Sequence, residues 1–490
     1  MVLASVSSGR AARARGTTVT TNQPSTPARA SDDPDYAANL RRATLASSVG
    51  SALEYYDFAL YGLASALIFS KVFFTDLDPA AGLVASFATF GVGFIARPLG
   101  GIFFGTIGDR LGRKWVLLVT IALMGGASTL VGALPTYDQI GLWAPALLVL
   151  MRLLQGFGAG AEQAGATVLM AEYAPVRRRG FFAALPFIGI QAGTLLAAGV
   201  FVYLGTLPTE VLLAGVWRIP FLASIVLIGV ALFIRLRLRE SPTFVQLEKQ
   251  DQVADSPLKE IFTSSFPNVL RGIGLRMAEN GGSYLFNTLA VSFVVGTIGV
   301  GAWIGPLAVA VGSLVGIVSV PFAGHLSDRF GRLPVYRFGA LFLLVLAFPG
   351  WWLLSLGNPV IVIVVIAVAI GFGVNTMLGS QCALLPELFG NRHRYIGVAT
   401  SRELSAVLAG GLAPVLGAWF IGISGGAWWP LATYVFVLAA ITFATTFIVP
   451  ETRGRDLTSL QDASLDTDED VRTRPTAIVS RKEYLARASR

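Results

Sequence analysis

The chain has 490 residues, of which 54% are hydrophobic and only 13% are charged. A soluble domain carries about 25% charged residues, so this composition excludes a soluble globular protein and requires much of the apolar surface to face lipid. The formal net charge of +8 does not indicate a nucleic-acid-binding protein, because the basic residues gather on alternate connections between long apolar stretches.

About twelve apolar stretches are long enough to cross a membrane, which takes about 20 residues. Backbone groups in lipid must find their partners within the segment, so each stretch is predicted to be a helix. The stretches lie near residues 45–69, 80–107, 113–134, 142–172, 180–204, 214–237, 268–297, 302–326, 334–356, 358–384, 394–421 and 428–449. The sequence therefore predicts an all-α membrane protein with twelve transmembrane helices.

The two ends of the chain are polar. Residues 1–44 are rich in Ser, Thr, Arg and Ala and lack the apolar core of a cleaved signal peptide. Residues 452–490 are also polar, and we expect both tails to be disordered. The positive-inside rule places the arginine-bearing connections and both tails in the cytoplasm. We expect a multi-pass protein of the plasma (inner) membrane with both termini cytoplasmic.

The first apolar stretch contains "SALEYYDFALYG", in which Glu54, Asp57 and Tyr61 follow the i, i+3, i+7 spacing of one helix face. A charge at the centre of a membrane helix costs about 2.5–3.5 kcal/mol, so the two acids must face other helices or a wet cavity. Two acids one turn apart cannot both ionise cheaply, and we expect one of them, with Asp57 favoured, to keep its proton.

Later stretches carry further charged residues deep in the predicted helices. A guanidinium binds a carboxylate through two parallel hydrogen bonds, and we expect Arg97 and Arg152 together to clamp one anionic group. Glu162, Arg402 and Glu403 can instead form ion pairs that simply join helices. Arg276 and Glu279 can pair with each other, because they lie at i and i+3 of one helix.

A short basic motif occurs twice, as "GTIGDRLGRK" at 105–114 and as "GHLSDRFGRL" at 324–333, each after the second stretch of a set of six. The polar residues 239–267 separate the sets, so we predict two pseudo-symmetric six-helix bundles over 45–238 and 268–451. The repeated aspartate can pair with nearby arginines and with a helix N-terminus, which favours a conformational latch over a signal that only sets topology. The expected latch residues are Gly105, Asp109, Arg110, Gly112, Arg113, Asp328, Arg329 and Arg332.

These motifs, together with "RLLQGFGAGAE" at 152–162 and "ENGGSYLF" at 279–286, resemble the major facilitator superfamily and its metabolite:proton symporter branch. The resemblance covers about residues 45–456. It implies alternating access to a site between the bundles and proton-coupled import of a small carboxylate metabolite or a zwitterionic osmolyte. The chain departs from this branch at "ATSRELSAVLAGG" (399–411), where Arg402 and Glu403 replace residues expected to be small, Tyr or Gln.

Two sets of site residues follow from these helix faces and from the resemblance. The residues expected to bind substrate are Arg97, Arg152, Gln155, Arg276, Asn280, Tyr284 and Tyr61, although the two tyrosines also suit helix packing. The residues expected to couple transport to protons are Asp57, Glu54, Glu162 and Glu279.

Other functions fit less well. A proton-coupled exporter is an alternative, but "PFIGIQAGTLLAAG" (186–199) lacks the Gly-Pro-x-x-Gly-Gly pattern expected of exporters, and the tails contain no signalling module that would favour a non-transporting nutrient receptor. We find no phosphate-binding loop, no Ser/His/Asp arrangement and no zinc-ligand spacing. We therefore expect no enzyme activity, metal or cofactor. The expected partners of this monomer are a small-molecule substrate, protons and the lipid bilayer, and its glycines along 156–166 are expected to serve close helix packing.

Overall fold

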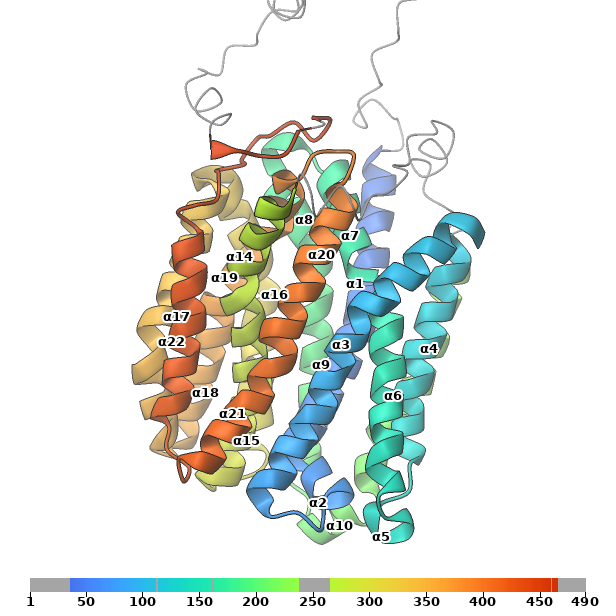
Figure 1. Ribbon diagram of the computed structural model, residues 1–490, viewed down its shortest axis with the longest axis vertical. Coiled ribbons are helices and arrows are strands. Elements are labelled where there is room, and N and C mark those ends of the chain that lie inside the picture. The colour runs from blue at the N-terminus through green and yellow to red at the C-terminus, as the bar shows by residue number, and fades with distance from the viewer. Residues whose placement is uncertain (1–35, 112, 161, 238–264, 460, 466–490) are drawn as a thin grey trace, which may run out of the picture.

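The computed structural model describes residues 36–111, 113–160, 162–237, 265–459 and 461–465, and all regular secondary structure within them is helical (Figure 1). The helices follow the predicted stretches closely. The stretch predicted near 302–326, for example, is the helix Ile304–Phe330. The prediction of an all-α chain is confirmed.

The described part of the first half contributes six long helical stretches and three short helices. The long stretches are α1 (Tyr36–Leu67), α3 (Pro79–Leu111), α4 (Arg113–Ala133), α6 (Trp143–Ala159) continued by α7 (Glu162–Tyr173), α8 (Arg179–Ala184) continued by α9 (Ile188–Leu204), and α11 (Ile219–Arg237). The short helices are α2 (Phe69–Phe73), α5 (Tyr137–Ile140) and α10 (Thr209–Leu213).

The second half repeats the pattern with six more stretches. They are α14 (Phe266–Tyr284) continued by α15 (Ala290–Ser292), α16 (Ile304–Phe330), α17 (Arg332–Ser355), α18 (Pro359–Val368) continued by α19 (Asn375–Leu388), α20 (Arg394–Ser405) continued by α21 (Leu412–Ile423), and α22 (Trp429–Thr445). Four wider π-helical segments lie in three of these described stretches. The segments are Leu285–Leu289, Phe293–Thr297, Ala369–Val374 and Ala406–Gly411.

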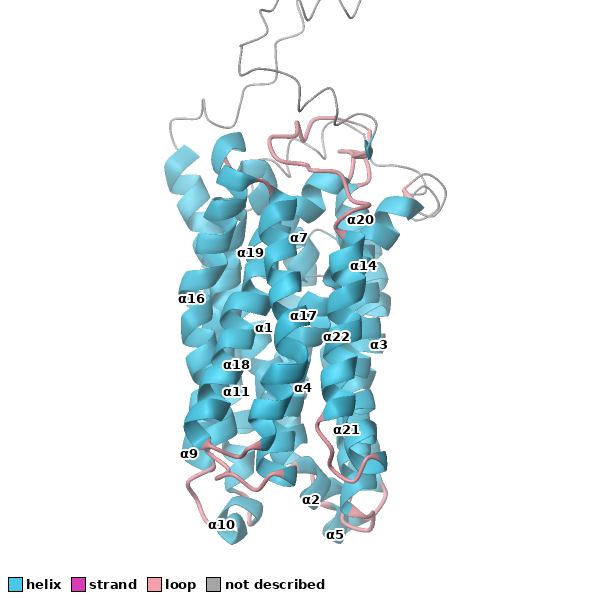
Figure 2. Ribbon diagram, turned by 90° about the vertical axis from the view of Figure 1, so that its left-hand side faces the viewer, coloured by secondary structure: helices cyan, strands magenta, loops and turns pink. Residues whose placement is uncertain are grey.

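The helices run roughly side by side, so the molecule has two ends (Figures 1 and 2). We call the end at which the described chain begins and finishes the terminal end, and the end that carries α2, α5 and α10 the distal end. Contacts between the halves are made mainly by α16 with α8 and α9, and by α21 with α3.

Many outward-facing side chains are apolar and exposed. Leu99 is 61% exposed and Val318 is 68% exposed, as expected for a surface that lipid covers. Six of the described stretches are long and apolar enough to cross a membrane. They are Pro79–Phe104, Val176–Leu204, Ile304–Phe330, Arg332–Ser355, Pro359–Leu388 and Arg394–Ile423, and four shorter apolar helices accompany them.

Two tail residue ranges differ from the prediction of disorder. Residues 36–44 already belong to α1. Residues 452–459 and 461–465 pack against the terminal end, where the backbone N–H of Ala463 donates to Leu388 O at 2.9 Å and that of Asn391 donates to Ser459 O at 2.8 Å. The sequence prediction failed here because these contacts satisfy the backbone groups left open at helix ends, which a polar composition does not reveal.

Close packing of α3 on α6 depends on glycine. A Cβ at Gly156 would overlap the carbonyl oxygen of Gly93, and one at Gly100 would overlap the carbonyl oxygen of Phe157. We expected the glycines of 156–166 to serve close helix packing, and the contact of Gly156 with the backbone of Gly93 confirms this for Gly156. This close approach positions the arginines of both helices in one buried layer.

Candidate functional site

One arginine is held by two acids, one from each half of the chain. Arg97 on α3 donates from Nη1 to Glu54 Oε1 on α1 at 3.1 Å. Its Nε and Nη2 donate to the two carboxylate oxygens of Glu403 on α20, at 2.9 and 3.3 Å. All three residues are buried. The Arg97–Glu403 contact therefore ties the two bundles together through the paired geometry in which an arginine binds a carboxylate most strongly.

A second group of charges lies beside this bridge. Arg276 Nη1 is 3.1 Å from Glu279 Oε2, one turn along α14, and its Nε donates to Ser405 Oγ at 2.8 Å. This is the local ion pair that the i, i+3 spacing allowed. On α20, the guanidinium carbon of Arg402 lies 5.5 Å from the ring centre of Phe187, which belongs to the other bundle.

Arg152 on α6 is enclosed by aromatic rings. Its guanidinium carbon lies 4.5 Å from the ring centre of Phe58, 4.4 Å from that of Tyr61 and 4.6 Å from that of Phe90. Its Nη1 donates to Gln155 Oε1 and its Nε donates to Phe90 O at 3.3 Å. Its Nη2 has no acceptor among the described residues. Aromatic rings and two hydrogen bonds thus hold this buried charge. No carboxylate in the described part of the chain forms an ion pair with it.

The expected clamp of Arg97 and Arg152 on one anion is not formed in this conformation. The ring of Phe58 contacts both guanidinium groups, and Glu403 already occupies the paired donors of Arg97. The sequence indicated the depth of both arginines correctly, but it did not identify the acid that fills the fork.

Asp57 belongs to a polar chain inside the first bundle. It is 5% exposed and accepts from Ser224 Oγ on α11 at 3.2 Å. Ser128 on α4 also interacts with this carboxyl group. Gln155 Nε2 donates to Ser128 Oγ at 2.7 Å, and Gln155 accepts from Arg152. The chain therefore connects Asp57 to the enclosed arginine through two neutral side chains.

The two acids of α1 do not share a partner. Glu54 pairs with Arg97, whereas Asp57 faces Ser224 and makes no ion pair in the described part of the chain. Their spacing led us to expect that mutual repulsion would keep one of the two acids protonated. In the structure the two carboxyl groups instead lie in separate environments. Only Asp57 is buried without an arginine at hydrogen-bonding distance.

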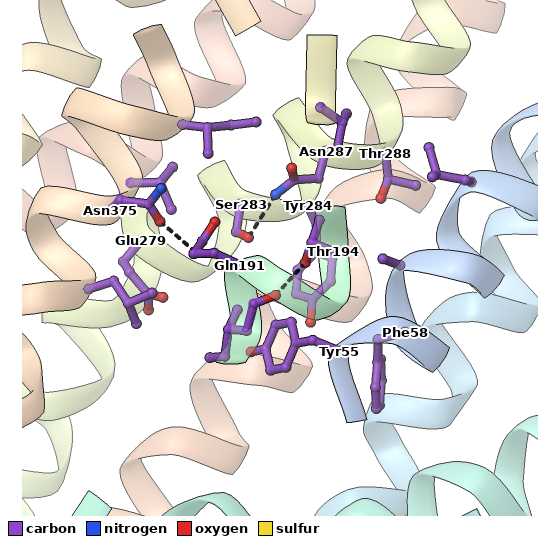
Figure 3. Close-up of a pocket in the computed structure, with 17 residues that line it drawn as sticks. Tyr55, Phe58, Gln191, Thr194, Glu279, Ser283, Tyr284, Asn287, Thr288 and Asn375 are labelled. Carbon is purple, nitrogen blue, oxygen red and sulfur yellow. Dashed lines mark hydrogen bonds between the residues drawn. The ribbon is translucent and has the colours of Figure 1, made fainter. Parts of the chain in front are cut away.

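Two small cavities lie between the bundles near these residues, and Figure 3 shows the larger of them. The smaller, of about 10 Å³, is lined by Tyr55, Phe94, Arg97, Arg276, Asn280, Tyr284, Arg402, Glu403 and Ala406. The larger, of about 40 Å³, has a lining that includes Tyr55, Gln191, Thr194, Glu279, Ser283, Tyr284, Asn287 and Asn375. Tyr55 and Tyr284 line both. Cavities of this size hold a few water molecules, so the molecule is closed around its site.

Contacts between the bundles close the site on both sides. Toward the distal end, a Cβ at Gly91 on α3 would lie 2.8 Å from Gly411 O. Toward the terminal end, a Cβ at Gly324 on α16 would lie 2.5 Å from Gly180 O on α8. Glycine at these positions allows the two backbones to meet, which a larger side chain would prevent.

The remaining predicted site residues divide into two groups. Asn280 and Tyr284 line the cavities together with Arg276 and Glu279. Tyr61 lies elsewhere: it is 1% exposed, donates to Thr89 Oγ1 at 2.9 Å and packs edge-on against Phe69. In this conformation Tyr61 packs against its neighbours, and its contact with substrate stays a prediction. The side chain of Glu162 lies outside the described residues.

The second copy of the repeated motif joins the bundles at the terminal end. Asp328 Oδ1 and Oδ2 accept from the backbone N–H groups of Gly180 and Phe181, at 2.7 and 2.9 Å, at the start of α8. Arg332 Nη1 donates to Asp328 at 2.7 Å. Arg329 is different, because its guanidinium packs over the ring of Phe330 at 5.4 Å. The side chains of the first copy, Gly105 to Arg113, lie outside the described residues.

A reciprocal pair of ion pairs surrounds this contact. Arg179 on α8 donates to Glu387 on α19, and Arg394 on α20 donates to Glu172 on α7, both at 2.8 Å. Sequence analysis did not identify these pairs. A signal was present, because in each half a glutamate is followed seven residues later by an arginine, and each glutamate bonds the arginine of the other half.

The comparisons with known proteins agree with this architecture. The chain matches the family model described as "Sugar (and other) transporter" over residues 43–269 and 282–463. It is 37% identical to the proline/betaine transporter of Escherichia coli (strain K12), covering 88% of this chain and 87% of that protein. It is 36% identical to the shikimate transporter of the same strain, covering 84% of this chain and 95% of that protein.

Among solved structures, the chain is similar to the major facilitator superfamily proton:xylose symporter XylE bound to 6-bromo-6-deoxy-D-glucose. The TM-score is 0.68 at 18% identity, covering 86% of this chain and 98% of that one. This likeness concerns the fold, and it confirms the prediction of twelve transmembrane helices in two six-helix bundles.

Proposed function

We propose, since this chain belongs to the sugar (and other) transporter family of the major facilitator superfamily, that it imports a small carboxylate or zwitterionic metabolite together with protons by alternating access. As a member of that family it is a metabolite transporter and not an enzyme. The relatives named for proline and betaine and for shikimate support a substrate that carries a carboxylate.

The observation that carries this proposal is the bridge formed by Glu54, Arg97 and Glu403. It is buried, it borders the smaller cavity, and it joins the two bundles that must separate and rejoin in alternating access. A guanidinium in this position offers the paired donors that a substrate carboxylate requires. The unfilled Nη2 of Arg152 supports a second contact with substrate in a more open conformation.

Asp57 is the acid best suited to carry the proton. Ionising it inside the bundle leaves a charge that no described arginine neutralises, whereas the other described acids of this layer pair with arginine. A carboxyl of this kind can bind a proton on one side of the membrane and release it when its surroundings change.

We also propose a location in the inner membrane with the terminal end in the cytoplasm. One relative in Escherichia coli is named an inner membrane metabolite transport protein. The exposed arginines at the terminal end, including Arg177, Arg178, Arg329 and Arg453, support this orientation.

The test is uptake into proteoliposomes that contain the purified protein. Labelled proline, glycine betaine, shikimate and α-ketoglutarate are supplied separately, with the interior at neutral pH and the exterior acidic. At least one compound should accumulate above its external concentration, and a protonophore should abolish the accumulation. Protein-free liposomes give the background. Failure of every compound to accumulate under this gradient, or accumulation only when the interior is the acidic side, would overturn the proposed import.

A further inference from the structure

The Arg97–Glu403 pair places a positive and a negative group side by side where a ligand between the bundles would lie. Arg97 comes from α3 and Glu403 from α20, and they are 4% and 6% exposed. Both border the smaller cavity. A ligand in the smaller cavity would lie against both residues, and each of them requires a new partner if the pair is opened.

The Arg97–Glu403 pair carries no net charge, and both of its members are buried. A ligand that offers only a carboxylate would bind Arg97 and leave the Glu403 carboxylate without its cation, which is costly in a buried site. A zwitterion gives each member of the pair a partner of opposite charge and adds no net charge.

The lining of the smaller cavity suits the positive end of such a ligand. Tyr55, Phe94 and Tyr284 contribute aromatic rings to the cavity that Glu403 also lines. Phe94 and Tyr284 already pack edge to face, with ring centres 5.1 Å apart. A substituted ammonium is attracted both by a carboxylate and by the faces of aromatic rings. Arg97, which also keeps Glu54 at 3.1 Å, is the matching partner for the negative end.

We propose that the substrate is a zwitterion that splits the Arg97–Glu403 pair, its carboxylate binding Arg97 and its ammonium or quaternary nitrogen binding Glu403. This inference rests on the proposed function and makes it narrower. The empty carrier then holds itself closed with the same two groups that later hold the substrate, and Glu403 selects against simple anions.

The experiment compares zwitterions with an anion in proteoliposomes containing the wild-type chain or Glu403→Gln. Proline and glycine betaine are the zwitterionic probes, and shikimate is the anionic probe. Wild type should accumulate a zwitterion in preference to shikimate. Glu403→Gln removes the partner of the substrate nitrogen and leaves the site one positive charge in excess. Zwitterion uptake should therefore fall by about tenfold or more, while shikimate uptake should rise.

Two further variants separate this role from a general effect of charge or folding. Glu172→Gln removes the same charge from the Arg394 pair, which also joins the bundles but lies outside both cavities, and it should keep the preference for zwitterions. Glu403→Asp keeps the charge and should keep the preference too, with weaker binding. The elution profile and melting temperature of each purified variant establish that it is folded.

Several results would overturn the inference while leaving proton-coupled import intact. They are accumulation of shikimate and of neither zwitterion by wild type, an unchanged ratio of zwitterion to anion uptake in Glu403→Gln, and equal changes of that ratio in Glu403→Gln and Glu172→Gln. Absence of gradient-driven uptake of all three probes and of α-ketoglutarate by wild type would instead overturn the proposed function itself.

Discussion

At the scale of single residues, Asp57 is set apart by its partners. It accepts from Ser224 and connects to Arg152 only through neutral side chains, whereas Glu54 is fixed in an ion pair. We therefore predict that Asp57→Asn abolishes accumulation driven by a pH gradient but leaves exchange of labelled for unlabelled substrate at equal pH. The variant keeps the shape of the side chain and its contact with Ser224 but cannot exchange a proton.

Uptake with a gradient and counterflow without one, in the same proteoliposomes, measure the two parts of this prediction. Glu54→Gln is the companion variant, because it neutralises the other acid of α1. If both variants still concentrate substrate against its gradient, the proton carrier lies at another residue.

Sequence reasoning identified which charges are buried but not how they pair. Burial followed from energy, since a charge exposed to lipid is costly at any rotation of its helix. Pairing depends on how two helices from different bundles are rotated and placed along each other, and no local spacing encodes that. Arg276 and Glu279 were predictable because they share a helix, whereas Arg97 and Glu403 are 306 positions apart in the chain.

At the scale of helices, the contact between α3 and α6 sets how close the two membrane arginines come. We predict that Gly156→Ala destabilises the protein by at least about 1–3 kcal/mol, the usual range for overpacking, because its methyl group would meet the rigid backbone of Gly93. Gly199→Ala on α9 is the matched control, since a Cβ there meets nothing within 4 Å.

Thermal unfolding of the purified variants in detergent measures this difference. The control should melt at or above the wild-type temperature, because alanine favours a helix over glycine. Equal melting temperatures for Gly156→Ala and Gly199→Ala would mean that the two helices can separate without penalty.

Helix positions were predictable because membrane-spanning stretches need long apolar runs, but the interruptions inside them were not. The described π-helical segments all lie in the second half, and residues from three of them line the cavities, including Asn287, Ile370 and Ala406. Such segments are frequent at functional sites. They form where a neighbouring helix accommodates the extra residue, so apolar periodicity gives no sign of them.

At the scale of the whole molecule, the two bundles are joined at both ends and at the middle. The distal contact is a close approach of two uncharged backbone segments at Gly91 and Gly411, whereas the terminal contact is largely ionic. An ionic contact can be opened without exposing a large apolar surface to water. We therefore expect the terminal contacts to set how often the molecule opens toward that end.

Asp328 provides the test, because its carboxylate accepts from two backbone N–H groups across the bundle interface. A hydrogen bond to a charged group contributes about 1.5–3 kcal/mol, so Asp328→Asn should increase the population open at the terminal end by about tenfold or more.

Spin labels at the exposed positions Arg177 and Arg329, one on each bundle, report the distance between the bundles by double electron–electron resonance. Asp456→Asn is the matched control, since the side chain of this exposed acid accepts only from Thr458 in the described structure. The population of molecules with the longer distance between the labels should grow in Asp328→Asn. It should stay at the wild-type level in Asp456→Asn. Identical distance distributions in the two variants would reduce the repeated motif to a signal for membrane topology.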